Sequence, residues 1–413
     1  MTRLLFVLLV LPSLAAEPTC SEGTTLAGVA PPDGDAVWCQ RLQTDGSFIK
    51  EGPAQEYHRN GELKAEGAHL DGQRHGVWHV YHSNGRKKAE GEYVLGKRQS
   101  AWLHWYDTGG QEAVGNYLNN QKHGKWNYWH DNGEKWFEGD YSLGKAARDW
   151  TYWHTNGQID ATGKFINGAK YGLWTHHYDD GIRKSQGSYS TGARDGTWTY
   201  WREDSSKERT GMYRAGREFG TWTWFYPNGN KQRLANYTSG TLHGLERTYA
   251  EAGYPISESA WDMGVKHGTC ILYHPNGQVK EEGTWSRGKM NGVFHYFFED
   301  GGKDRLEEWQ VGQKHGHWEA WWPNGERKFD GRLEKGQEVG LWVHYYEDGT
   351  RKGEGNFELG RPVGEWRVWH PNGQLKSLGS YDDGKRHGSW VHYDEDGSEL
   401  RQETYEAGKK IAG

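Results

Sequence analysis

Aromatic residues and glycines recur along the chain at a fixed spacing of 24 residues. The pattern is clearest in residues 76–96, GVWHVYHSNGRKKAEGEYVLG, and it returns without insertion or deletion from Ala54 to Trp390. With Trp78 as the anchor, fifteen positions are equivalent, and tryptophan fills eleven of them. A spacing kept over so much of the chain identifies a repeat array. Offsets below are counted from the anchor of each repeat.

Within each repeat, two short β-favouring runs flank a turn. Offsets +6 and +7 are Asn-Gly in eight repeats and Asp-Gly in four. These dipeptides favour two-residue hairpin turns in which both residues have positive φ. The chain is therefore predicted to be all-β, a solenoid-like ribbon of stacked antiparallel β-hairpins with a 24-residue repeat and about fifteen units.

Such a turn determines which residues face each other across the hairpin, because paired offsets then sum to 13. Trp126 is predicted to lie opposite Gly139, and Gly76 opposite Tyr93. A large ring over a bare glycine on the neighbouring strand restores packing that the glycine lacks. We predict that two such pairs in each repeat stabilise an array with few aliphatic side chains.

Offset +3 points to the face opposite the anchor tryptophans, because side chains alternate along a strand. It is aromatic in fourteen repeats, and lysine is frequent at its predicted cross-strand neighbour, offset +10. Lysine stems over rings indicate a half-exposed face that a ligand or partner could contact. The candidate binding face consists of Trp105, Trp129, Trp153, Trp201, Trp321 and Trp369.

The N-terminus differs from the array in composition. Residues 1–16 contain Arg3, a short apolar run and two alanines, which is typical of a secretory signal peptide. The apolar run is too short to span a bilayer. The mature chain is therefore expected to be exported, to the periplasm or the extracellular space, with no membrane span.

Residues 17–53 are interpreted as an N-terminal cap with a partial repeat, and residues 54–413 as the array. In an oxidising compartment Cys20 and Cys39 would form a disulfide within the cap. The array contains one weak register, residues 244–267, in which Glu246 replaces the anchor tryptophan and Ser259 the glycine at +13. A bend or soft joint is expected there.

Charge and motif content exclude several classes of function. The net charge is −6 with both signs mixed along the chain, so there is no basic block for nucleic acid. No catalytic acid and base pair, nucleophile elbow, phosphate loop or cofactor motif is present. Histidines recur at offsets −3 and +4, but equivalent positions lie about 10 Å apart, too far to share a metal ion. We predict no catalytic residues, no metal and no cofactor.

The unit GxWxxYxxNGxxxxxGxYxxGKxxG resembles the MORN-repeat variant family, which includes YwqK-like proteins described as antitoxin components. Its fullest copy runs over residues 364–388, with Trp366, Asn372-Gly373, Gly379 and Tyr381 at the motif positions. The resemblance implies a ribbon of β-hairpins that binds other proteins, and it carries over no catalytic residues. Choline-binding cell-wall repeats also combine tryptophan, tyrosine and glycine, at a shorter period, which keeps a second interpretation open.

The leading prediction is a non-enzymatic exported scaffold that binds another protein, with an antitoxin- or immunity-like role as its specific form. The partner would be a toxin or an envelope protein. The alternative is a module that binds glycan or cell wall, with the rings at +3 as stacking platforms.

Overall fold

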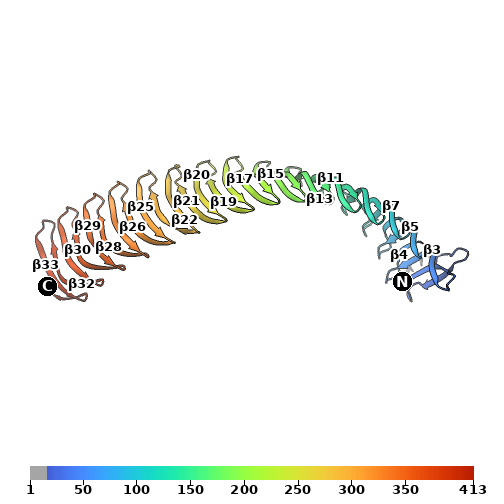
Figure 1. Ribbon diagram of the computed structural model, residues 1–413, viewed down its shortest axis with the longest axis horizontal. Helices are drawn as coiled ribbons and strands as arrows, with labels where there is room; N and C mark the ends of the chain where they lie inside the picture. The colour runs from blue at the N-terminus through green and yellow to red at the C-terminus, as the bar shows by residue number, and fades with distance from the viewer. Residues whose placement is uncertain (1–15) are drawn as a thin grey trace, which may run out of the picture. The chain divides into compact units, whose positions relative to one another are not determined.

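The computed structural model describes residues 16–413, and its regular secondary structure in this range is entirely β (Figure 1). The predicted signal peptide, residues 1–16, lies outside the described residues except for Ala16. No helix in the described part of the chain is long and apolar enough to cross a membrane. The all-β prediction is confirmed.

The chain divides into two compact units, residues 1–205 and 206–413. Within each unit the strands pair antiparallel with the next one in sequence, except that β23 and β24 both pair with β22, so each unit is a meander of hairpins. The strands of the first unit are β1 (Thr25–Val29), β2 (Ala36–Leu42), β3 (Phe48–Tyr57), β4 (Leu63–Leu70), β5 (Gln73–Tyr81), β6 (Lys87–Val94), β7 (Lys97–Trp105), β8 (Gln111–Leu118), β9 (Gln121–Trp129), β10 (Lys135–Ser142), β11 (Lys145–Trp153), β12 (Ile159–Ile166), β13 (Ala169–His177), β14 (Arg183–Ser190) and β15 (Ala193–Trp201).

The second unit continues the same pattern, and its strands lie side by side in sequence order (Figure 1). Its strands are β16 (Lys207–Arg214), β17 (Arg217–Phe225), β18 (Lys231–Thr238), β19 (Thr241–Tyr249), β20 (Pro255–Asp262), β21 (Val265–Tyr273), β22 (Val279–Ser286), β23 (Lys289–Met290), β24 (Gly292–Phe297), β25 (Lys303–Gln310), β26 (Gln313–Trp321), β27 (Arg327–Glu334), β28 (Gln337–Tyr345), β29 (Arg351–Glu358), β30 (Arg361–Trp369), β31 (Leu375–Asp382), β32 (Lys385–Tyr393), β33 (Glu399–Glu406) and β34 (Lys409–Ala412). The starts of β5, β7 and β9 keep the 24-residue spacing that the sequence predicts.

The Asn-Gly turns are three-residue loops, so the predicted two-residue turn is wrong. In the repeat anchored at Trp78, the His82 N–H donates to Arg86 O and the Gly85 N–H to His82 O. Only Gly85 has a positive φ, 80°, which is the arrangement of a type I turn followed by a bulge. The two-residue turns with positive φ at both positions occur at the other end of the strands, as at Leu95-Gly96.

The asparagine at +6 is used for its side chain rather than for its backbone conformation. The Asn132 Oδ1 accepts from the Glu134 N–H in its own turn, and the Asn132 Nδ2 donates to Thr155 O of the next repeat, at 2.7 Å. All eight Asn-Gly turns make this second bond. The asparagine therefore joins adjacent turns.

Replacing Asn132 with aspartate should separate its two roles. The carboxylate still accepts from Glu134 N–H but cannot donate to Thr155 O, so we expect a loss of about 1 kcal/mol in the free energy of unfolding. Asn132→Ala removes both bonds and should cost more. Urea unfolding of the two variants checks this, and a loss no larger for alanine than for aspartate would contradict it.

The Trp/Gly contacts join successive repeats rather than the two strands of one hairpin. The backbone register agrees with the prediction, because Trp126 pairs with Gly139. However, the Trp126 ring covers Gly115 of the preceding repeat, where a Cβ would lie 2.2 Å from the indole. The Trp126 indole N–H also donates to Asn116 O at 3.0 Å. Ten of the eleven anchor tryptophans cover a glycine of the preceding repeat in this way and so hold the two repeats together, whereas Trp318 lies opposite Glu307.

The second predicted pair, a tyrosine ring over the glycine at −2, is wrong. Gly76 faces Tyr93 in the register, but a Cβ on Gly76 would meet nothing within 4 Å. Instead, Gly76 has a φ of 76°, a conformation that side-chain-bearing residues rarely adopt. The Tyr93 ring packs edge-on against Trp78 and Trp102.

Cations cover the anchor rings in a sheet that has no second layer of strands or helices among the described residues. In seven of the eleven repeats with an anchor tryptophan, a cation at offset −4 lies over that ring, as with Lys170 over Trp174 at 3.9 Å and Arg74 over Trp78 at 4.0 Å. Alanine at offset +11 completes the packed face. Long cationic stems thereby bury Trp78 and Trp174 completely.

Two repeats that lack the anchor tryptophan, at Glu246 and Cys270, also lack the glycine that this ring would cover in the preceding repeat. Ala235 stands where a glycine would lie under the missing tryptophan at Glu246, and Glu246 forms an ion pair with Arg233 at 2.6 Å. Ser259 likewise pairs with Cys270, which is buried and free. Strands β19 and β20 form most of the weak register, residues 244–267. They pair antiparallel within the second unit, as the strands of other repeats do. In the cap, Cys20 and Cys39 form a disulfide.

Candidate functional site

The six tryptophans of the candidate binding face occupy equivalent places in the fold. Each is the last residue of its strand, next to a three-residue loop, and each is half-buried. Four lie in the first unit and two in the second. The fold therefore presents Trp105, Trp129, Trp153 and Trp201 as one series and Trp321 and Trp369 as another.

Cations lie over several of these rings, but they come from a different offset than predicted. The bulge beside the loop pairs offset +3 with +9, as in Tyr81 with Lys87, so the predicted pairing with +10 is wrong. The residue at +9 reaches the ring of the following repeat. Such contacts are Lys87 over Trp105 (5.4 Å), Lys135 over Trp153 (5.1 Å), Arg183 over Trp201 (5.1 Å) and Lys303 over Trp321 (5.3 Å).

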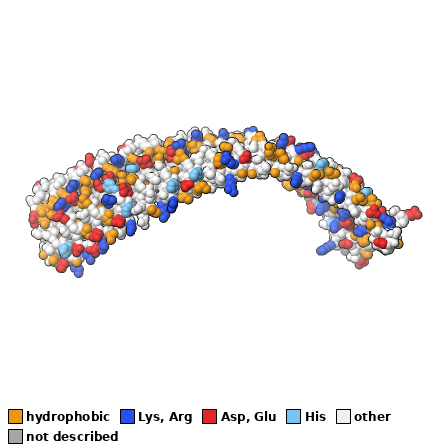
Figure 2. Space-filling view, viewed as in Figure 1, with side chains coloured by type: hydrophobic (Ala, Val, Ile, Leu, Met, Phe, Trp, Pro, Cys, Tyr) orange, Lys and Arg blue, Asp and Glu red, His pale blue; other side chains and the backbone are white. Residues whose placement is uncertain are grey.

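The lysine at +10 lies over the ring at +4 of its own repeat. Lys328 covers Trp322 at 4.5 Å, and Lys184 covers Tyr178 at 5.1 Å. Two rows of cation–ring pairs therefore run along the loop edge of the strands. In the view of Figure 2, basic and hydrophobic side chains are interspersed rather than gathered in one apolar block.

The histidines at +4 hold adjacent repeats together. His82 Nε2 lies 2.9 Å from Trp105 O, and all six histidines at this offset make the same contact. Tyrosine replaces histidine in other repeats, as where Tyr106 Oη donates to Trp129 O at 2.6 Å. The backbone of the tryptophan face is therefore fixed from the preceding repeat.

An apolar pocket of about 300 Å³ lies in the second unit, and its lining includes residues at offsets +2 and +11 of the packed face. Phe329, Val368 and Trp322 line it, with Lys328 and Lys352 among its lining residues. Burial and the Lys352 charge lower the pKa of His344, a further lining residue. The sequence analysis did not identify the pocket.

A glycine leaves room for this pocket. Gly353 occupies offset +11, which is alanine in several other repeats, and its φ is not positive. A Cβ there would make only ordinary contact with Arg367 O, at 3.6 Å. Glycine at an offset where neither conformation nor packing requires it is the signal that could have revealed the pocket.

Together, the hairpin meander, the 24-residue period and the inter-repeat tryptophans define a β-hairpin repeat protein. The sequence of the MORN repeat variant family matches residues 50–69, 220–238, 266–286, 338–358 and 362–383. Five segments of the chain therefore match the MORN repeat variant, as the motif predicts.

Other comparisons add little. A search of curated proteins found no match. Among solved structures, TcdB2-TccC3-Cdc42 is similar at 10% identity and a TM-score of 0.14, over 89% of this chain and 28% of the other. A Tc holotoxin pore of Photorhabdus luminescens is similar at 10% identity and a TM-score of 0.15, over 89% of this chain and 27% of the other. The chain spans less than a third of these relatives, and such scores carry no structural argument.

Proposed function

We propose that this protein is a non-enzymatic, exported scaffold that binds another protein through the tryptophans at +3. The observation that carries the proposal is the series of half-buried rings paired with cations along the loop edge. Aromatic rings and arginines are enriched where proteins bind each other, and they supply much of the affinity.

The cations define the chemistry of the partner. Lys87, Lys135 and Arg183 lie beside apolar rings, and Lys87 and Lys135 also form ion pairs with Glu90 and Glu138 at 2.6 Å. A complementary surface would carry carboxylates that compete for these cations, next to apolar side chains. The pocket of the second unit has the same character, because its apolar walls are accompanied by Lys328 and Lys352. An exported acidic toxin or an envelope protein fits this description, and an antitoxin- or immunity-like role is the specific form we propose.

A second candidate is binding to cell-wall glycan, and one observation favours it. Among the described residues no cation lies over Trp129 or Trp369, and the residue at +9 in the repeat before Trp129 is Gln111. An uncovered indole face can stack on a sugar ring. The two candidates therefore assign different residues: glycan binding needs Trp129, whereas protein binding needs the cation-covered tryptophans and their cations.

Pull-down experiments with the purified chain separate the two candidates. We expect a discrete protein partner to be captured from envelope and secreted fractions, and K87Q/K135Q/R183Q to weaken capture about tenfold, because each removes a charge contact. Trp129→Ala should leave capture unchanged. Retention on purified cell wall that Trp129→Ala abolishes, without any protein captured, would contradict the scaffold and support the glycan module.

A further inference from the structure

One repeat differs from all others at three positions of the face opposite the anchor tryptophans. In the repeat anchored at Trp318, offsets −1, +1 and +12 are His317, Glu319 and Asp330. No other repeat combines three residues of the metal-binding types at these offsets. Within the described residues 16–413, this is the one group of at least three such side chains whose ligand atoms converge.

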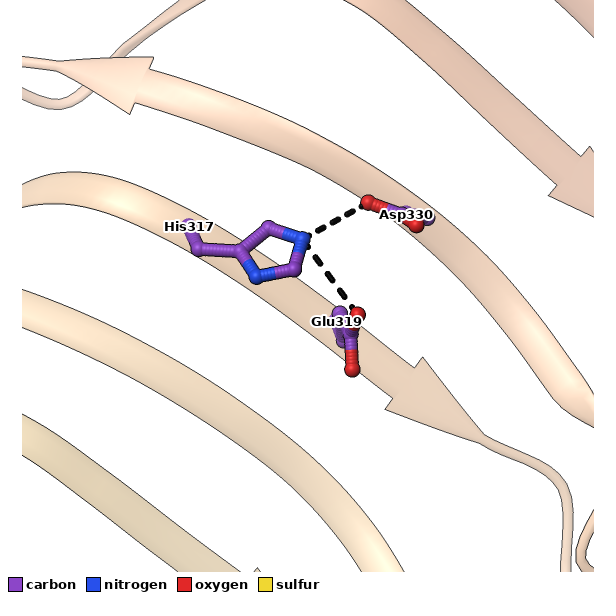
Figure 3. Close-up of side chains that lie close together, drawn as sticks. All are labelled: His317, Glu319 and Asp330. Carbon is purple, nitrogen blue, oxygen red and sulfur yellow. Dashed lines mark hydrogen bonds and ion pairs between the residues drawn. The ribbon is translucent and has the colours of Figure 1, made fainter.

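The β-sheet brings the three side chains together. Glu319 on β26 and Asp330 on β27 are direct cross-strand partners, and His317 precedes Glu319 by two residues on the same face. His317 Nε2 lies 2.8 Å from Asp330 Oδ1 and 3.3 Å from Glu319 Oε1, and the three ligand atoms lie within 4.8 Å of one another (Figure 3). Both carboxylates therefore face the same imidazole nitrogen.

Convergence on one nitrogen distinguishes this cluster from a similar one elsewhere. His79 also contacts two carboxylates, but Glu66 lies 3.8 Å from its Nδ1 and Glu90 3.6 Å from its Nε2. Opposite edges of one imidazole ring cannot be occupied by a single ion. His79 therefore bridges two glutamates, whereas His317, Glu319 and Asp330 enclose one common point.

The surroundings hold these side chains in place. The Glu319 side chain is only 11% exposed. The Glu308 carboxylate accepts a hydrogen bond from the backbone N–H of His317 at 2.9 Å. A Cβ on Gly316 would lie 1.8 Å from Glu308 Oε2, so the glycine provides room for this carboxylate. Arg327 contacts Asp330 Oδ2 at 3.0 Å, which leaves Asp330 Oδ1 directed at His317.

We propose that His317, Glu319 and Asp330 bind a divalent transition-metal ion of the zinc type. One imidazole and two carboxylates match the ligands of zinc, with expected metal–ligand distances of about 2.0–2.2 Å. Ca²⁺ is a poor fit because it takes about six to eight oxygen ligands. Three protein ligands leave at least one coordination position for water or for a group supplied by a partner.

The neighbouring arginine makes the proposal more specific. The Arg327 guanidinium contacts both carboxylates, at 3.0 and 3.6 Å, and so competes with a bound cation. Removing the Arg327 charge is therefore expected to strengthen metal binding, the opposite of what removing a ligand would do.

Titration calorimetry with ZnCl₂ at pH 7.5, on the full chain freed of metal with a chelator, tests the site. We expect one site in the native protein and tighter binding in Arg327→Gln. His317→Ala and Asp330→Asn should lose at least about 100-fold in affinity, because removing a ligand costs more than the roughly 10- to 100-fold of a change behind a ligand. His79→Ala should bind as the native chain does. Because Asp330→Asn is nearly isosteric, unchanged circular dichroism shows that it folds.

Visible absorption of the Co²⁺-loaded protein gives a second readout. A spectrum of low-coordinate Co²⁺ that disappears in Asp330→Asn supports the site. Zinc affinity and stoichiometry that are the same in the native chain, His317→Ala and Asp330→Asn would overturn it, and so would Zn²⁺ binding that only His79→Ala reduces.

Discussion

Replacing Gly331 with alanine is expected to lower the free energy of unfolding of the second unit by about 3 kcal/mol. The added Cβ would lie 2.2 to 2.6 Å from three atoms of the Trp342 indole. That ring cannot easily withdraw, because it is almost fully buried and its N–H donates to Arg332 O at 3.2 Å. Either the ring leaves its place or β27 and β28 separate.

Gly353→Ala is the matched control for this substitution. Gly353 also lies in a strand without a positive φ, and its added Cβ would make only ordinary contact. Alanine should therefore be neutral there or stabilise by a few tenths of a kcal/mol, because it restricts the unfolded chain. Urea unfolding of both variants provides the measurement. Equal losses for the two would contradict an account in which the tryptophan contact, rather than the glycine itself, matters.

The first unit is expected to lose stability as the pH falls from about 6.5 towards 4. Burial and nearby cations lower the pKa of His69, His104 and His176 to about 4 each, from an ordinary value of 6.5. Below pH 6.5 the unfolded chain binds protons that these folded imidazoles do not, so acid favours unfolding. Stability from these groups is complete above pH 6.5 and is lost as the pH approaches 4.

The array supplies substitutions that test this directly. Other repeats carry valine or tyrosine where these histidines stand, so His69→Tyr, His104→Val and His176→Tyr should fit the packed face. In the native chain we expect the melting temperature of the first unit to fall by on the order of 5 °C between pH 7.5 and 5. The triple variant should lose most of this dependence. Hydrogen exchange resolved by peptide assigns the change to residues 1–205, and an unchanged pH dependence would contradict the histidine explanation.

Much of the fold could be predicted because the repeat is strict. Period, strand positions and the register around the anchors follow from tryptophan and glycine spacing, and Trp126 does pair with Gly139. The turn could not be assigned from Asn-Gly alone, because the same dipeptide suits a two-residue turn and a three-residue loop with a bulge. The predicted register survived near the anchor because the irregularity between Val80 and Tyr81 compensates for the longer loop.

The main error of the prediction concerns which repeat supplies the tryptophan ring that covers each glycine at +13. Nine of the eleven glycines at +13 have a tryptophan on both neighbouring strands, as Gly91 has Trp78 and Trp102, and spacing does not say which ring covers the glycine. The direction of the tryptophan side chain decides which glycine it covers. One feature of the sequence could have indicated that direction. Glycine is lost one repeat before the tryptophan is lost, at Ala235 ahead of Glu246.

The sites were harder to predict than the fold. The six tryptophans at +3 are half-buried, and the bulge changes which cations accompany them. The cluster at His317 does not follow from the repeat pattern, because the recurring histidines lie at −3 and +4 whereas His317 departs from the repeat. In a regular array, candidate functional residues are best sought in the repeat that departs from the common pattern.

Two double-mutant cycles that share Gly91→Ala test most directly whether tryptophan joins successive repeats. Gly91→Ala is combined with Trp102→Ala in one cycle and with Trp78→Ala in the other, and the free energy of unfolding is measured for each variant. We predict a coupling of about 1–3 kcal/mol with Trp102, because removing its ring makes room for the new Cβ, and close to zero with Trp78. Strong coupling with Trp78 and none with Trp102 would show that the contact lies within a hairpin and would contradict the account.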